Sequence, residues 1–267
     1  MKNSFLLIAS LLVFSLLCVS AASFAQQHSA GAGVQYSQHK HDLFSITSSD
    51  YWVAFPSNYN GENDGGKFIK IYISSADSTT AFIAGNGLVP VSLPVVPGAT
   101  TVFNVPLSWE METSDSVENK ALHVWSDDAS LFVDFESQDA YTSDASNLIP
   151  SAGWGQHYLV ASYESLNEQE GVYNYDEPSE FVIVANQDST SVTIIPANAL
   201  RSNAGVHPAG MPFTISMNAG QSVQYQVVKV TSDSVFDATG TSILSSKPVG
   251  VIGASSCANI PVLFPYC

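Results

Sequence analysis

Short runs of β-branched and aromatic residues recur along the chain from Asp50 onward, and Gly, Pro, Asn or Asp bounds each run. Such runs are typical of β-strands, and no long window carries the period of an amphipathic helix. The pattern therefore predicts an all-β protein. The expected strands cover residues 51–55, 68–73, 80–84, 101–105, 122–125, 131–135, 158–163, 181–185, 191–195, 213–217, 222–228 and 249–253.

These runs are of two kinds. In residues 68–73, Lys70 alternates with Ile69 and Ile71, which predicts one polar and one apolar face. Residues 181–184 are apolar throughout, which indicates a strand buried on both faces. A β-sandwich contains both kinds of strand.

Four sequence matches recur in the same order and indicate an internal duplication. They pair residues 51–54 with 158–161, 67–79 with 180–190, 97–100 with 219–222, and 130–133 with 248–251. A unit of roughly 100 residues is the size of a small β-sandwich. We therefore expect two tandem β-sandwich-like modules, the first over residues 50–140 and the second over residues 141–267.

One of the matches contains an Asp-Ser-Thr tripeptide in each copy, beginning at Asp77 and at Asp188. Because Asp bonds to its own backbone two residues on, each tripeptide is expected to form a tight hairpin between neighbouring strands. Longer polar insertions are where binding specificity is expected to lie. These insertions are residues 58–66, 164–178 and 198–210.

The N-terminus carries the pattern of a cleavable signal peptide, because Lys2 precedes an apolar run over residues 5–19 and then small residues. Ser23 and Ala25 fit signal-peptidase cleavage after Ala25, with cleavage after Ala21 as the alternative. Residues 1–25 are thus expected to be removed on export, and residues 26–49 to form a flexible lead-in.

No later stretch reaches the roughly 18 apolar residues of a transmembrane helix. The most apolar one, residues 88–96, is interrupted by Pro90 and Pro94. We therefore expect no membrane span, and a location outside the cell or on its surface. With 24 acidic and 8 basic residues, the net charge of −16 repels nucleic acid and anionic lipid. Neither is expected as a partner.

No motif for catalysis, a cofactor or a metal is present. Ser255-Ser256-Cys257 has no recognisable His partner, and the histidines at 39, 41, 123, 157 and 207 show no metal-ligand spacing. The oxygen-rich loop at 58–66 fails the spacing of a calcium-binding EF-hand. The chain is therefore not expected to be an enzyme or to need a cofactor.

Acidic residues keep one catalytic alternative open. Glu110, Glu112, Asp134 and Glu136 are candidates for the carboxylate pair of a glycosidase, with Trp109 or Trp154 available for sugar stacking. Asp134 is more simply the solvent face of its strand, because it alternates with Val133 and Phe135.

Two cysteines follow the signal peptide. In an oxidising compartment, Cys257 and Cys267 are expected to be oxidised, by pairing with each other or with cysteines elsewhere.

The end of the second module reads Thr239-Gly240-Thr241, then Ser245-Ser246-Lys247-Pro248-Val249, then Cys257-Ala258. This combination resembles the IgGFc-binding protein N-terminal domain family. Ser143-Asp144-Ala145, Leu148-Ile149-Pro150, Tyr158 and the block at 180–195 agree with it. The resemblance covers most of residues 50–267.

The resemblance implies a non-enzymatic extracellular module near the N-terminus of a large secreted or surface protein. Antibody binding does not follow, because no known residue motif for it maps onto this sequence. The family pattern continues past the last cysteine, so we expect the chain to be a fragment.

The expected function is therefore a non-catalytic extracellular binding or scaffold module acting in adhesion, with a glycan or protein partner. The alternative is a secreted carbohydrate-active enzyme or its carbohydrate-binding accessory module.

Overall fold

The computed structural model describes residues 49–59, 66–139, 142–165, 169–170, 173–174, 177–228 and 237–258. Within these ranges the chain forms β-strands, two 3-10 turns and loops, and it contains no α-helix. The prediction of an all-β protein is confirmed. The predicted signal peptide, the lead-in up to residue 48 and Cys267 lie outside the described ranges.

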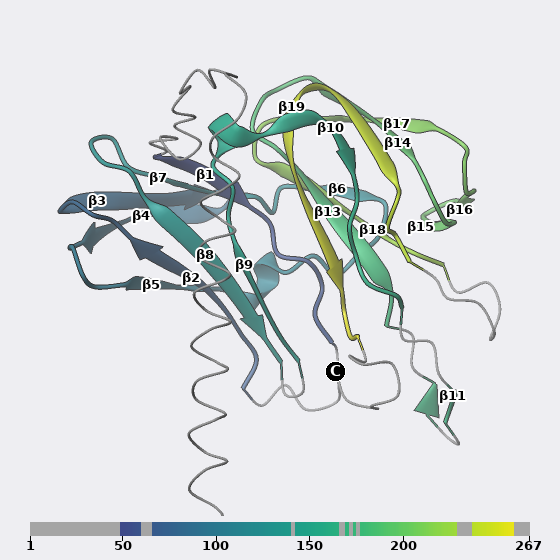
Figure 1. Ribbon diagram of the computed structural model, residues 1–267, viewed down its shortest axis with the longest axis horizontal. Helices are drawn as coiled ribbons and strands as arrows, with labels where there is room; N and C mark the ends of the chain where they lie inside the picture. The colour runs from purple at the N-terminus through teal and green to yellow at the C-terminus, as the bar shows by residue number, and fades with distance from the viewer. Residues whose placement is uncertain are drawn as a thin grey trace, which may run out of the picture. The chain divides into compact units, whose positions relative to one another are not determined.

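Two four-stranded antiparallel sheets form the first sandwich (Figure 1). One sheet has the order β1 (Asp50–Val53), β7 (Leu122–Trp125), β3 (Thr79–Gly85) and β4 (Leu88–Val95). The other has the order β5 (Thr101–Val105), β2 (Phe68–Ser74), β8 (Phe132–Gln138) and β9 (Ser143–Asn147). Their facing side chains form one apolar core, to which Ile71, Ile83, Val124 and Phe135 contribute.

The second sandwich is built from one seven-stranded sheet. Its order is β17 (Phe213–Met217), β14 (Thr190–Ile195), β19 (Ser242–Ser255), β13 (Ser179–Ala185), β18 (Gln221–Gln226) and β6 (Ser116–Glu118), and β10 (Gly155–Leu159) also pairs with β19. β19 pairs with β14 over residues 242–245 and with β13 over residues 249–255. β19 therefore belongs to both layers of this sandwich, one with β14 and β17 and the other with β13 and β18. The two layers enclose a second core that includes Phe181, Ile194 and Tyr225.

The remaining elements are short. Two hairpins are formed by β11 (Gln169–Glu170) with β12 (Tyr173–Asn174) and by β15 (Leu200–Ser202) with β16 (Gly205–His207). The 3-10 turns are η1 (Leu107–Trp109) and η2 (Ser151–Gly153).

Burial follows both predicted patterns. In β2 the side chains of Ile69, Ile71 and Ile73 are buried, whereas Lys70 is partly exposed. All seven residues of β13 are buried. Phe181 and Ile183 face the core of the second sandwich, and Val182 and Val184 face a third cluster. The prediction that this strand is covered on both faces is confirmed.

The Asp-Ser-Thr tripeptides do not form the predicted hairpins. β2 and β3 lie in different sheets, and β13 and β14 do not pair with each other. Each tripeptide therefore carries the chain from one layer to the other. The prediction was wrong because turn residues favour a chain reversal but do not choose the pairing partner, which depends on the burial of each strand's apolar face.

Residues 88–95 form β4 despite Pro90 and Pro94. The strand is the last of its sheet, the position where proline is tolerated because its missing N–H costs no ladder bond. β6, β9, β15 and β16 were not predicted, because they are short and largely polar.

We expect Ile183→Ala to lower the free energy of unfolding by about 2–4 kcal/mol, because it leaves a cavity in a core where Ile183 is fully buried. Ile149→Ala is the matched control, since Ile149 is 63% exposed, and should change stability by less than about 0.5 kcal/mol. Urea unfolding of both variants measures the difference. Equal effects would contradict this assignment of the core.

Candidate functional site

The two sandwiches meet across an apolar seam. Val182 and Val184 of β13 contact Ala54, Met111 and Ala121 from the first sandwich. Trp52 and Trp154 pack against the same cluster, and Ile252 of β19 packs against the first core. Burial of these apolar side chains joins the sandwiches. Polar and open regions lie along the margins of the seam.

Glu180 lies on the seam face of β13 and is fully buried. Its Oε2 accepts hydrogen bonds from Ser57 Oγ at 2.6 Å and Gln226 Nε2 at 2.8 Å. Its Oε1 has no hydrogen-bond partner in the described part of the chain. Burial raises the pKa of this carboxyl to about 8, and the charges of Glu110 and Glu177 act in the same direction against the two hydrogen bonds. Glu180 is therefore mostly protonated at neutral pH.

Lys67 holds two further buried carboxylates. Its Nζ lies 3.0 Å from Glu110 Oε2 and 3.4 Å from Asp139 Oδ2. Burial acts to lower the pKa of Lys67, but the hydrogen bonds and charges of the two carboxylates outweigh it, so the pKa is raised. Glu110 also accepts the backbone N–H of Asn58 at 2.7 Å. These contacts fix the loop after β1 against the loop after η1.

A cavity of about 270 Å³, the charged pocket, opens beside these groups. Acidic and basic side chains from both sandwiches line it, together with uncharged polar residues. The lining residues are Ser57, Asn58, Lys67, Glu110, Glu112, Glu177, Pro178, Arg201, Gln226 and Ser256.

A second open region, the groove, runs between β9 and residues 250–258 at the end of β19. Three adjoining cavities of about 550, 160 and 410 Å³ form it. Gly253 lines all three, Asp144 lines the first two, and Ser146 and Ile252 line the last two. Its far wall is the segment 161–163. A Cβ atom on Gly253 would lie 1.8 Å from the carbonyl oxygen of Ala161, so only glycine allows this segment to lie so close.

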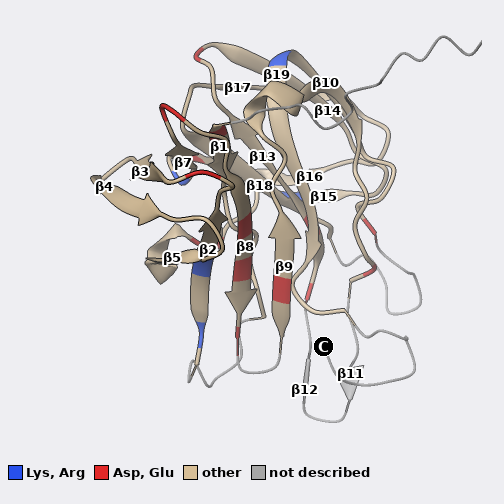
Figure 2. Cartoon of the chain, turned by 60° about the vertical axis from the view of Figure 1, so that its left-hand side comes forward, with Lys and Arg blue, Asp and Glu red and all other residues tan. Residues whose placement is uncertain are grey.

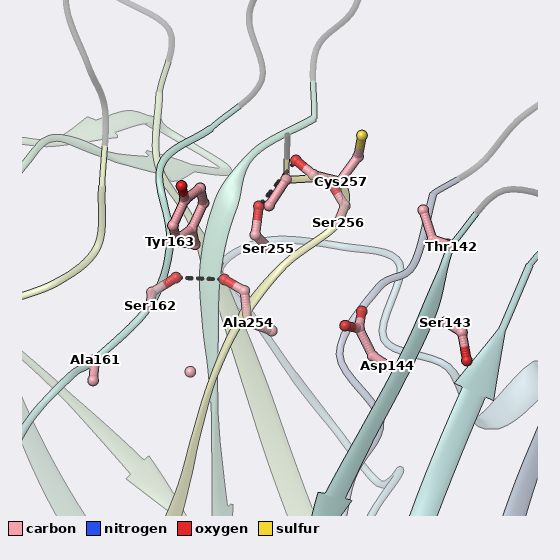
Figure 3. Close-up of a pocket in the computed structure, with 12 residues that line it drawn as sticks. Thr142, Ser143, Asp144, Ala161, Ser162, Tyr163, Ala254, Ser255, Ser256 and Cys257 are labelled. Atoms are coloured by element: carbon pink, nitrogen blue, oxygen red, sulfur yellow. Dashed lines mark hydrogen bonds between the residues drawn. The ribbon is translucent and has the colours of Figure 1, made fainter. Parts of the chain in front are cut away.

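Figure 3 shows the wider end of the groove, with Asp144 on one side and Ser162 and Ala254 on the other. Ser162 Oγ donates to the carbonyl oxygen of Ala254 and lies 2.8 Å from Ser179 Oγ. Asp144 is the one residue with a formal charge at neutral pH among the described lining residues of the groove. Burial raises the pKa of its carboxyl.

The structure separates the four predicted carboxylates. Glu110 and Glu112 line the charged pocket. Asp134 and Glu136 lie on the outer face of β8, where acidic residues are visible in Figure 2. They accept hydrogen bonds from Asn147 Nδ2 and from the hydroxyl of Tyr72, both at 2.6 Å. The interpretation of Asp134 as a solvent-face residue is confirmed.

Neither tryptophan lines the charged pocket. Trp109 is 8% exposed in the first core and offers little surface to a sugar ring. Trp154 lines the narrower end of the groove and donates its Nε1–H to the carbonyl oxygen of Ile149 at 3.1 Å. No described lining residue of the charged pocket is aromatic.

Among the described residues, no group of three His, Cys, Asp or Glu side chains is arranged to hold a metal ion. His123 bonds to Asp50 at 2.6 Å and stacks on the rings of Trp52 and Trp125. His39, His41 and most of the oxygen-rich loop, residues 60–65, lie outside the described ranges. Cys257 is buried beside the groove, and its pairing with Cys267 stays a prediction.

Sequence reasoning did not identify Lys67, Asp144 or Glu180 as site residues. Glu180 did carry a usable signal, since it directly precedes a run whose apolar residues predicted burial on both faces. Asp144 carried none, because a polar pentapeptide gives no indication that it borders a groove.

Residues 144–267 match the family model described as IgGFc binding protein. The resemblance is confirmed over these residues, and it supports an extracellular binding module. The match begins in β9 and covers most of the second sandwich and both sides of the groove. Comparisons with curated proteins and with solved structures found no match. In the part of the chain that the structure describes, no helix has the length and apolarity to span a membrane.

Glu180 predicts a pH dependence of stability. Between about pH 5 and 8 the folded protein keeps a proton on Glu180 that the unfolded chain has released, so stability falls as the pH rises, by at most about 1.4 kcal/mol per pH unit. Glu180→Gln should remove this decline and be more stable than the wild type at pH 9.

Chemical denaturation at pH 5, 7 and 9 measures the effect. Glu112→Gln, an exposed carboxyl of the charged pocket, is the control and should keep the wild-type profile. An unchanged slope in Glu180→Gln would show that Glu180 does not hold the proton.

Lys67→Met should destabilise the fold by about 3–5 kcal/mol, because it leaves Glu110 and Asp139 buried without their cation. Adding Asp139→Asn should restore part of that loss. The control is Lys70→Met, which removes an amine 3.7 Å from the ring centre of Phe68 and should cost less than about 1 kcal/mol. Thermal unfolding of the three variants tests this; similar losses for Lys67→Met and Lys70→Met would contradict it.

Proposed function

We propose that this chain is a non-catalytic binding or scaffold module of a larger secreted or cell-surface protein and that it acts in adhesion. It is exported through the signal peptide at residues 1–25. The partner is an extracellular protein in the first instance, in keeping with the description of the matching family, and a glycan is the second candidate.

The groove beside the buried apolar seam supports the proposal most directly. Val182 and Val184 bury the contact between the sandwiches, so the groove walls are held by two packed cores. A concave surface on a rigid scaffold can bind a partner without reorganising first, which limits the entropic cost of association. The separation of Asp134 and Glu136 from Glu110 and Glu112 gives the glycosidase alternative no support.

We also propose that residues 50–140 and 141–267 are two modules related by internal duplication. Each module gives one strand to the other sandwich, since β9 pairs with β8 and β6 pairs with β18. Strand pairing supports the duplication. β2 lies between β5 and β8, as β13 lies between β18 and β19. β3 pairs with β4 and β7, as β14 pairs with β17 and β19. β19 thus takes the places of both β7 and β8, and Gly98 and Gly220 have positive φ angles in the matched turns.

Adhesion is tested with beads that carry the purified mature chain, applied to panels of extracellular-matrix proteins, mucins, immunoglobulin Fc and glycans. We expect saturable retention on at least one protein surface, and competition by the same chain in solution. Beads carrying heat-unfolded chain are the control. Retention that is equal for folded and unfolded chain would contradict a folded binding module.

The enzymatic alternative is tested separately, by measuring products released from glycans. Incubation with the same glycans should give no products, because the charged pocket lacks an aromatic sugar platform among its described residues. Turnover that is abolished by Glu110→Gln or Glu112→Gln would overturn the non-catalytic proposal.

A further inference from the structure

Two unpaired strand edges border the groove. β9 is the last strand of its sheet, and no described strand pairs with its outer edge. Over residues 250–255, β19 pairs with β13 on one edge and with no described strand on the other. An unpaired edge presents a row of N–H and C=O groups that an extended peptide can satisfy by adding as a strand.

The length of the groove along β9 matches that of a short extended peptide. Its lining follows β9 from Asp144 to Asn147 and continues to Leu148 and Ile149. At about 3.3 Å per residue, this path accommodates an extended segment of about five residues. A glycan would fill the volume, but it lacks the regular alternation of donors and acceptors that matches a strand edge. The edges therefore favour a polypeptide.

The charge of Asp144 predicts the type of one side chain in the bound segment. The Asp144 carboxylate accepts no hydrogen bond and forms no ion pair with a described residue, and no described Lys, Arg or His lines the groove. Figure 3 shows this carboxylate on the side of Asp144 that faces Ala254. Asp144 is exposed to solvent, and a carboxylate without a cation is the complement of a basic side chain. The net charge of −16 would also attract a basic segment.

The other end of the groove is apolar. Leu148, Trp154, Tyr158 and Ile252 line it, and it contains no charged residue among those described. On a strand added to β9, residues opposite Asp144 and Leu148 are four positions apart and point to the same face. The groove therefore fits a segment with a basic and a large apolar side chain separated by three residues.

We propose that the groove binds an extended segment of a partner protein, which adds as a strand to the outer edge of β9 and places a Lys or Arg side chain against Asp144. This proposal rests on the proposed binding function and specifies the class of partner. Strand addition supplies affinity through the main chain, and Asp144 with the apolar end supplies selectivity.

The test uses two blocked heptapeptides of Thr and Val that carry Arg and Leu four positions apart, in the two possible orders. Fluorescence anisotropy should show that at least one binds the wild-type chain. Replacing its Arg by citrulline, a neutral isostere, should weaken binding about tenfold or more. N-methylation of alternate amides on the β9 side should abolish binding.

Asp144→Asn should weaken the Arg peptide by the same factor and leave the citrulline peptide unchanged, so that the double-mutant cycle shows coupling between the two groups. The matched control is Asp127→Asn, an exposed aspartate in a turn outside the groove, which should bind as the wild type does. Amide exchange should slow at residues 144–147 when the peptide is bound.

Three results would overturn the proposal: no binding of either peptide, equal binding of the Arg and citrulline peptides, or protection that leaves β9 unchanged. Thermal unfolding of Asp144→Asn checks that the variant is folded. If the bead assay still shows folded-state adhesion that Asp144→Asn does not alter, the groove proposal fails and the adhesion function stands. If adhesion is absent while the peptides bind, the adhesion function fails and the groove stands.

Discussion

Burial of both faces of β13 is the constraint on which the rest of this structure depends. Phe181 and Ile183 contribute to the second core, while Val182 and Val184 close the seam against the first sandwich. A strand with two apolar faces has no surface to leave in water, so it requires covering layers on both sides. The first sandwich provides one of these layers.

The same constraint explains why charged groups gather at the margin of the seam. The seam face of β13 continues from Val182 to Glu180, beyond the reach of the apolar cluster and next to the loops that carry Glu110 and Lys67. Lys67 forms ion pairs with Glu110 and Asp139, whereas Glu180 avoids a buried charge by holding its proton. Two different solutions to the cost of burying charge therefore lie side by side.

The groove lies where the two sandwiches meet without merging into one sheet. β6 extends the sheet of the second sandwich by pairing with β18, but β9 reaches no partner beyond β8 among the described strands. Gly253 lets the segment 161–163 lie directly on β19, which defines the opposite wall. The unpaired edge of β9 next to this wall is a place where a partner strand can bind. An unpaired edge without such a wall favours aggregation.

The sequence by itself determined the all-β class, most of the long strands and the two-faced burial of β13, because these follow from the local alternation of apolar and polar residues. It also carried the family resemblance that residues 144–267 confirm. Only the tertiary structure decided which strands pair, because an Asp-Ser-Thr turn reverses the chain but does not determine which strand the next one will pair with. The same holds for the site, because the sequence does not show which residues surround Lys67, Asp144 and Glu180. The burial and the partners of Lys67 and Glu180 depend on contacts between residues up to 123 positions apart, as for Ser57 and Glu180, and the groove beside Asp144 depends on how β9 and β19 come together.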